Sequence, residues 1–341
     1  MHNKQSLNNT RKPDECMKNM IYLDMNVFID VAQERNNWQN ILRKIFALKK
    51  TYCFPYSPAH MEELANLCRL QDGKCGLIKK NIKVISDVSD NMELLPGIPS
   101  LKKITDLRQA FAESTTPISA EMDTVLSTTE REWNLGRLSS LDLRPRLVEE
   151  PPIACLKRVL NDLSVTDFAL CNDIFHMGRK NKKSLEENFM HVNRNKKENL
   201  ESFVDMRQRL GIDTSKLNNL KGKDVFLQSG VKAIFQNSCR ENGLNPQNIP
   251  TGKELIKNYE LLEAYVTVCM NVLDKAGYYS DKENDVLKLR SRMNDISHAI
   301  YGSVTDYFVS NDTRLIRRIA SAYLFLGIST VVCDTNEFIE I

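Results

Sequence analysis

The chain has 341 residues, 42% hydrophobic and 27% charged, which is an ordinary balance for a globular protein. Its net charge of +3 neither predicts nor excludes a nucleic-acid partner. Nine irregularly spaced cysteines without a CxxC pair exclude an obvious zinc motif and predict reduced thiols in a cytoplasmic protein. The polar N-terminus lacks the apolar core of a secretory signal, and no apolar run approaches about 18 residues, so we expect no membrane span.

The first part of the chain alternates strand and helix patterns. Residues 21–24 (IYLD) predict a short buried strand that ends at an acid. Residues 25–50 carry apolar side chains at helical spacing, and residues 52–56 (YCFPY) predict a second strand. Ser57 and Pro58 then favour the start of a helix, because the hydroxyl can cap it and proline suits its first turn.

The C-terminal part repeats this alternation. We expect a helix at 285–303, a strand at 306–310, a helix at 311–327 and a strand at 329–333. Strand–helix alternation at both ends predicts an α/β fold with a central parallel sheet. The chain is therefore divided into a disordered tail (1–19), an N-terminal half of the α/β domain (20–94), a largely helical insertion (95–250) and a C-terminal half (251–341).

Four acids follow the predicted strands or lie in the adjoining helices: Asp24, Glu63, Asp295 and Asp312. Because ligands bind at the carboxyl ends of strands in open parallel sheets, Asp24 and Asp312 should face one crevice. Clustered carboxylates repel one another unless a divalent cation neutralises them, and hard oxygen ligands favour Mg²⁺ or Mn²⁺. One or two such ions would promote hydrolysis of a phosphate ester.

Three segments in order resemble the motifs of PIN-domain nucleases. LDMNVFIDV is similar to their strand ending in Asp with Asn two residues later, and SPAHMEEL to their helix with Glu just before Leu. NDISHAIYGSVTDYFVSNDTRL resembles the closing pair, an Asp on a helix and a strand ending in Ser/Thr-x-Asp. The resemblance covers about residues 20–90 and 255–341, with a longer separation between Glu63 and Asp295 than in compact PIN toxins.

This resemblance implies a PIN-like three-layer α/β/α fold interrupted by the helical insertion. It also implies that the four acids ligate Mg²⁺ or Mn²⁺, with Asn26 and Ser310 supporting the site. The implied activity is endonucleolytic hydrolysis of RNA, as in a toxin or antiviral defence effector, and a regulatory protein partner is implied with it. A homo-oligomer is left open.

Each acid has an ordinary alternative role. Asp24 and Asp312 each precede a helix, where a carboxylate caps the first N–H groups. Glu62 competes with Glu63 as the ligand on its helix.

For the third ligand, Asp285 and Asp306 compete with Asp295, which is favoured because it carries a DxxH pattern. Neighbouring polar residues are expected either to support the site or to pack without a catalytic role: His60, His298, Asp306 and Arg314. Arg317 and Arg318 are expected to form a solvated helix face.

Two basic runs in the insertion, 179–183 and 194–197, would add salt-dependent affinity for a phosphate backbone unless they form a solvated face beside nearby acids. Two other functions remain open. One is a structure-selective DNA nuclease, which would share the carboxylate crevice. The other is an inactive PIN scaffold that binds RNA or protein, for which no metal dependence is expected.

Overall fold

The structure is a computed structural model that describes residues 19–70, 75–95, 146–156, 203–280 and 286–341. The tail predicted at 1–19 (apart from Asn19), Asp285 and both basic runs lie outside the described residues. None of the described helices is long and apolar enough to cross a membrane.

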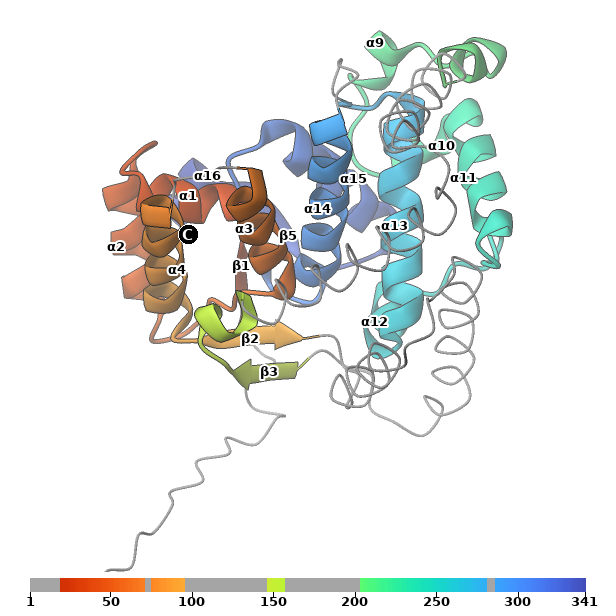
Figure 1. Cartoon of the computed structure of the whole chain (residues 1–341). Coiled ribbons are helices and arrows are strands. Elements are labelled where there is room, and N and C mark those ends of the chain that lie inside the picture. The colour runs from red at the N-terminus through yellow and green to blue at the C-terminus, as the bar shows by residue number, and fades with distance from the viewer. Residues whose placement is uncertain (1–18, 71–74, 96–145, 157–202, 281–285) are drawn as a thin grey trace, which may run out of the picture.

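A three-stranded parallel sheet occupies the centre of the described chain (Figure 1). Its strands are β1 (Ile21–Leu23), β4 (Tyr307–Ser310) and β5 (Val331–Asp334), in the order β1-β4-β5. A second sheet pairs β2 (Met92–Leu95) with β3 (Arg146–Glu149) in antiparallel fashion. The prediction of an α/β fold with a parallel sheet is confirmed.

The strand predicted at 52–56 is reduced to two isolated parallel bridges. Cys53 bridges to the residue before β1, and Tyr56 bridges to β2. Pro55, between them, has no N–H to donate, so a continuous ladder cannot form here. The segment nevertheless lies between β1 and β2. The next part of the chain after β1 therefore lies on one side of β1, whereas β4 pairs with the other side. In open α/β sheets, ligands generally bind at such a reversal of strand order, here at the carboxyl ends of β1 and β4.

The helix expected at 25–50 is broken in two, α1 (Met25–Ala32) and α2 (Trp38–Leu48). Between them Glu34, Asn36 and Asn37 take φ values of 57°, 45° and 62°. These left-handed values end α1, and asparagine adopts them more readily than most residues. The chain therefore turns sharply between the two helices.

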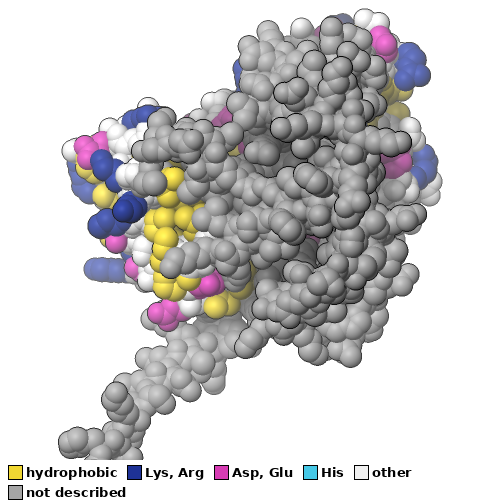
Figure 2. Space-filling model, viewed as in Figure 1, with side chains coloured by type: hydrophobic (Ala, Val, Ile, Leu, Met, Phe, Trp, Pro, Cys, Tyr) yellow, Lys and Arg dark blue, Asp and Glu magenta, His cyan; other side chains and the backbone are white. Residues whose placement is uncertain are grey.

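Helices cover both faces of the parallel sheet because successive strand side chains point to opposite sides. Ile21 and Leu23 join one buried hydrophobic cluster, whereas Tyr22 and Phe308 join another. The helices on the first face are α1, α2, α3 (Pro58–Leu70), α4 (Cys75–Ser89) and α16 (Thr335–Glu340). The cluster on the second face contains residues of α9 (Thr214–Leu217), α10 (Asp224–Leu227), α11 (Ser229–Glu241), α12 (Gly252–Lys257), α13 (Tyr259–Ala276), α14 (Val286–Gly302) and α15 (Thr313–Leu326). Figure 1 shows α9, α10 and α11 beyond α13, farther from the sheet. Figure 2 shows Lys and Arg side chains at the left edge, near α2, on the outer side of this arrangement.

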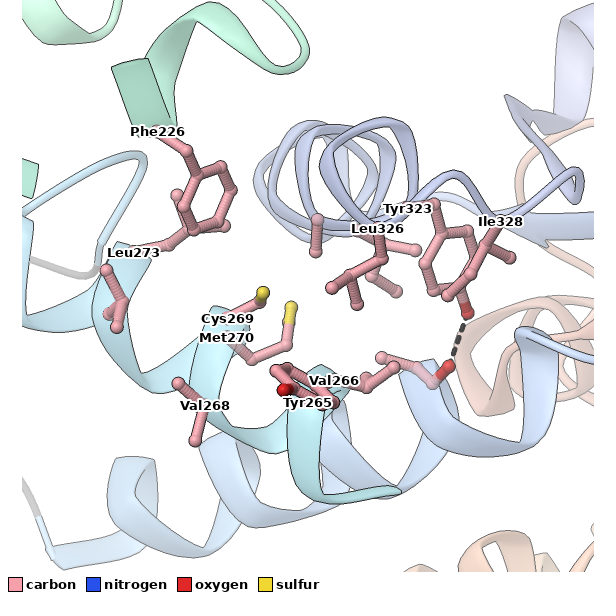
Figure 3. Close-up of a cluster of buried hydrophobic side chains, with 14 of the residues drawn as sticks. Phe226, Tyr265, Val266, Val268, Cys269, Met270, Leu273, Tyr323, Leu326 and Ile328 are labelled. Carbon is pink, nitrogen blue, oxygen red and sulfur yellow. Dashed lines mark hydrogen bonds between the residues drawn. The ribbon is translucent and has the colours of Figure 1, made fainter. Parts of the chain in front are cut away.

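The second cluster is centred on α13 and α15 (Figure 3). Val266 and Met270 of α13 lie opposite Tyr323 and Leu326 of α15. The Tyr323 hydroxyl also donates a hydrogen bond to the carbonyl of Ala299 on α14. Packing and this bond together fix α14 and α15, which carry two of the candidate ligands, relative to each other.

The described part of the predicted insertion contains α9, α10, α11 and helical residues 203–209, but also β3. It does not form a core of its own, because Val231 and Phe235 of α11 belong to the same cluster as Tyr22 of β1. Packing is thus continuous across the boundary predicted at residue 250.

Candidate functional site

Asp24 follows β1 directly and is buried at the start of α1. Its backbone N–H donates to Val309 O across 2.9 Å, which ties this end of β1 to β4. The carboxylate accepts from Met25 N at 2.9 Å through Oδ1. Through Oδ2 it accepts from Ser310 Oγ at 2.7 Å and from Asn26 Nδ2 at 3.1 Å. Asp24 is therefore a helix cap, as the ordinary alternative proposed, and is held in one orientation by both predicted supporting residues.

Ser310 connects Asp24 to Asp312. While it donates to Asp24, its hydroxyl oxygen accepts from Asp312 N at 3.0 Å. Asp312 Oδ1 accepts from Arg314 N at 2.8 Å and Leu315 N at 3.1 Å, so this acid caps α15. Asp24 and Asp312, which were predicted to face one crevice, are therefore both hydrogen-bonded to Ser310 at the carboxyl ends of β1 and β4.

His298 of α14 lies between Asp24 and Glu63. Its Nε2 is 3.2 Å from Glu63 Oε1 and 3.9 Å from Asp24 Oδ1. Burial alone would lower the pKa of His298, but the hydrogen bond and charge of Glu63, together with the charges of Asp24 and Asp295, raise this pKa above its ordinary value. The neighbouring Glu62 is also within electrostatic range of His298, and burial raises its pKa. Of these two glutamates, Glu63 is the one that contacts the histidine.

Asp295, one helical turn before His298, is paired with Arg318, a residue expected on a solvated helix face. Arg318 Nη2 lies 2.6 Å from Asp295 Oδ2, and Nη1 lies 3.5 Å from Asp274 Oδ1. Arg317 is exposed, but Arg318 is only 6% exposed, so the expectation of a solvated face is wrong for Arg318. Its position three residues after the buried Leu315 could have indicated the apolar face of α15.

The four acids act on one another electrostatically. Burial raises the pKa of Asp295 to about 7, and the charges of Asp24 and Asp312 contribute to the rise. Burial also raises the pKa of Asp24, and Glu63 adds to that rise. Carboxylates that disfavour one another's ionisation in this way are suited to a cation that would neutralise them.

Their donor atoms also fit a hard divalent cation, because all are carboxylate oxygens. Within the ranges that the structure describes, no three His, Cys, Asp or Glu side chains are arranged to hold one ion as they stand. Asp295 is engaged by Arg318, and one oxygen of Asp312 caps α15. Coordination by all four acids would therefore require Asp295 to exchange its guanidinium partner for the ion.

His60 of α3 is hydrogen-bonded to the end of β1. Its Nε2 is 2.8 Å from Leu23 O, and its Nδ1 accepts from Ser57 N at 3.0 Å. A carbonyl oxygen only accepts hydrogen bonds, so Nε2 carries the proton of a neutral ring. Burial holds the pKa of His60 well below its ordinary value. These contacts orient the end of β1 immediately before Asp24.

Asp306 lies at the wrong end of the sheet to support the acids. It precedes β4, and its Oδ2 accepts from Met20 N at 2.7 Å, just before β1 begins. Asp24 and Asp312 follow the opposite ends of these two strands, so the expectation that Asp306 adjoins the site is wrong. Arg314 is exposed in the first turn of α15.

A comparison of the chain with protein-family models, curated proteins and solved structures found no match. The resemblance to PIN-domain nucleases therefore stays a prediction that rests on the motifs themselves.

Proposed function

We propose that the chain is a PIN-like nuclease that uses Mg²⁺ or Mn²⁺ to hydrolyse phosphodiester bonds in RNA. The main support is that two buried side chains connect three acids from separate elements. Ser310 bonds to Asp24 and Asp312, and His298 lies between Asp24 and Glu63. This group occupies the carboxyl ends of β1 and β4, where the reversal of strand order favours a ligand crevice.

The residues that would hold the metal are Asp24, Glu63, Asp295 and Asp312. When bound, the ion would supply a deprotonated water and stabilise negative charge on the phosphate. The protein's own contribution is orientation: three hydrogen bonds fix the carboxylate of Asp24 before any ligand arrives.

Two helix N-termini add a further electrostatic contribution. Asp24 caps α1 and Asp312 caps α15, so both helices begin at the same edge of the sheet. The partial positive charge at a helix N-terminus favours an anionic group nearby. The anionic groups that these N-termini stabilise are the Asp24 and Asp312 carboxylates, which accept hydrogen bonds from the first amides of the two helices.

The preference for RNA, and a role as a toxin or defence effector restrained by a protein partner, follow from the resemblance. The metal and the acids alone would serve a DNA nuclease equally well. The substrate must therefore be tested directly.

The test is cleavage of pooled cellular RNA and of matched single-stranded DNA by the wild-type protein and Asp24→Asn, each with Mg²⁺, Mn²⁺ or EDTA. Asp306→Asn is the matched control, because this acid lies at the other end of the same strands. We expect metal-dependent RNA cleavage that Asp24→Asn reduces by more than about 100-fold, the upper range for a residue that merely orients a ligand. Asp306→Asn should retain activity.

The other outcomes separate the alternatives. Cleavage of DNA alone would support the structure-selective DNA nuclease. RNA binding without cleavage, indifferent to EDTA, would support the inactive scaffold. Equal cleavage by wild type and Asp24→Asn would contradict the proposed site.

A further inference from the structure

Four polar side chains form a continuous hydrogen-bonded chain behind the acids: Tyr22, Ser57, His60 and His298. All four are fully buried. Tyr22 Oη lies 2.7 Å from Ser57 Oγ and 2.7 Å from His298 Nδ1. Ser57 Oγ lies 3.1 Å from His60 Nδ1. This hydrogen-bonded chain of side chains thus connects α3 to α14 through Tyr22 of β1.

The two ends of this chain determine where the hydrogens lie. One end is His60 Nε2 at the carbonyl of Leu23, and the other is His298 Nε2 at the carboxylate of Glu63. A carbonyl oxygen and an ionised carboxylate only accept hydrogen bonds, so both Nε2 atoms must donate. The Nδ1 atom of each neutral ring is then an acceptor.

The donors for these two acceptors are also present. Ser57 N–H donates to His60 Nδ1 at 3.0 Å, so in this arrangement the Ser57 backbone joins His60 to the path and the Ser57 hydroxyl donates to Tyr22. The Tyr22 hydroxyl can then donate to His298 Nδ1. Every polar atom along this path has a partner, as buried polar groups require.

We propose that His298 is a positioning residue that holds Glu63 through its Nε2–H, and that the Tyr22 hydroxyl orients the His298 ring for this task. If the ring takes a second proton, the Tyr22 and Ser57 hydroxyls reverse direction and Nε2 still donates to Glu63. The inference rests on the proposed function only in treating Glu63 as a metal ligand. The hydrogen-bond assignment is independent of that function.

The role is distinct from packing. Tyr22 also packs against both histidine rings, with its ring centroid 5.1 Å from that of His60 and 5.7 Å from that of His298. Tyr22→Phe keeps this ring and removes only the hydroxyl. His298→Gln keeps an N–H donor for Glu63, whereas His298→Leu removes it. If His298 had a purely structural role, His298→Gln and His298→Leu would bind metal with the same affinity.

The experiment measures the affinity of the full chain for Mn²⁺ by calorimetry, with thermal unfolding of each variant as the check on folding. Tyr265→Phe is the matched control, because Tyr265 is also buried and its hydroxyl donates to Asn245 O at 3.0 Å, away from the acids. We expect Tyr22→Phe to weaken Mn²⁺ binding by about 10-fold and His298→Leu by up to about 100-fold, the range for residues that orient metal ligands. His298→Gln should bind more tightly than His298→Leu, and Tyr265→Phe should match the wild type.

A second measurement requires neither metal nor a Tyr22 variant that folds. Nitrogen NMR of the histidine rings in the wild type should show His298 with a hydrogen on Nε2, and that signal should shift in Glu63→Gln but not in Asp306→Asn. An Nδ1–H tautomer, or a signal indifferent to Glu63→Gln, would overturn the inference. So would equal Mn²⁺ affinities for His298→Gln, His298→Leu and the wild type.

The two measurements also separate this inference from the proposed function. If the wild type binds no Mn²⁺ but the NMR signal responds to Glu63→Gln, the hydrogen-bonded chain stands and the metal-dependent nuclease is contradicted. If Mn²⁺ binds and the NMR signal does not respond, the positioning role of His298 fails alone.

Discussion

Arg318 of α15 binds Asp295 of α14 across 2.6 Å, and its other terminal nitrogen lies 3.5 Å from Asp274 of α13. One buried guanidinium therefore joins three helices. It also gives Asp295 a positive partner in the absence of any metal. We infer that Arg318 and a divalent cation would compete for this carboxylate.

Arg318→Met tests this relationship. In EDTA, the variant removes the guanidinium that is paired with Asp295, and breaking a buried pair in this way costs about 3–5 kcal/mol. Its unfolding temperature should fall, and Mn²⁺ should then raise that temperature by more than it does in the wild type, because Asp295 no longer has an internal partner. Thermal unfolding with and without Mn²⁺ measures both effects.

The control for Arg318→Met is Arg317→Met, which removes the same charge from the exposed neighbouring position. A surface change of this kind should alter stability by less than about 0.5 kcal/mol. If Mn²⁺ stabilises both variants and the wild type equally, Arg318 and the metal do not compete.

Ser310→Ala should lower the affinity for Mn²⁺ without unfolding the sheet. The serine hydroxyl holds Asp24 Oδ2 at 2.7 Å, and loss of a group that orients a metal ligand typically lowers affinity by about 10–100-fold. Titration with Mn²⁺ measures the change. Ser321→Ala is the matched control, since this buried serine bonds to Tyr278 on another part of the molecule. Equal Mn²⁺ affinities in the two variants would show that Ser310 does not orient a ligand.

The buried His60 predicts a defined dependence of stability on pH. Its pKa in the folded chain lies well below the value of about 6.5 expected when unfolded. The unfolded chain therefore takes up the proton first. The stability that depends on neutral His60 is complete above about pH 6.5 and is lost as the pH falls toward the lower folded pKa, by at most about 1.4 kcal/mol per pH unit.

His60→Asn removes this titration and should make the free energy of unfolding fall less between about pH 7 and about pH 5. Urea unfolding of both proteins in EDTA measures the difference. Parallel pH curves for the two proteins would show that His60 is not held neutral.

Gly252→Ala should destabilise the contact between α12 and the end of α15. A Cβ atom at Gly252 would lie 1.9 Å from the backbone oxygen of Gly327, which cannot move away as a flexible side chain could. Overpacking of this kind costs about 1–3 kcal/mol. Gly76→Ala is the control, because a Cβ there meets nothing within 4 Å and alanine favours a helix by about 1 kcal/mol over glycine. In urea unfolding, the free energy of unfolding should therefore be lower than that of the wild type for Gly252→Ala and higher for Gly76→Ala.

Most predicted elements lie close to their expected positions because they depend on neighbouring residues. The apolar run before Asp24 indicates β1, and Ser57 with Pro58 indicates the start of α3. The split between α1 and α2 was missed, since the helical spacing of apolar residues continues past the left-handed asparagines. The strand at 52–56 was overestimated, because Pro55 limits its pairing to single bridges.

The sequence by itself therefore determined the α/β class and the positions of Asp24 and Asp312 before α1 and α15, where a helix cap was one of the open roles. The contact of Ser310 with Asp24, 286 positions away, depends on the pairing of β1 with β4. Only the tertiary structure decided the partners of the other charged groups. Asp295 is paired with a residue 23 positions away, and Asp306 with a backbone amide 286 positions away, at the opposite end of the sheet from Asp312. The physical reason is that a local pattern fixes which face or end of an element a side chain occupies. Packing of elements that are distant in the chain fixes what it meets there.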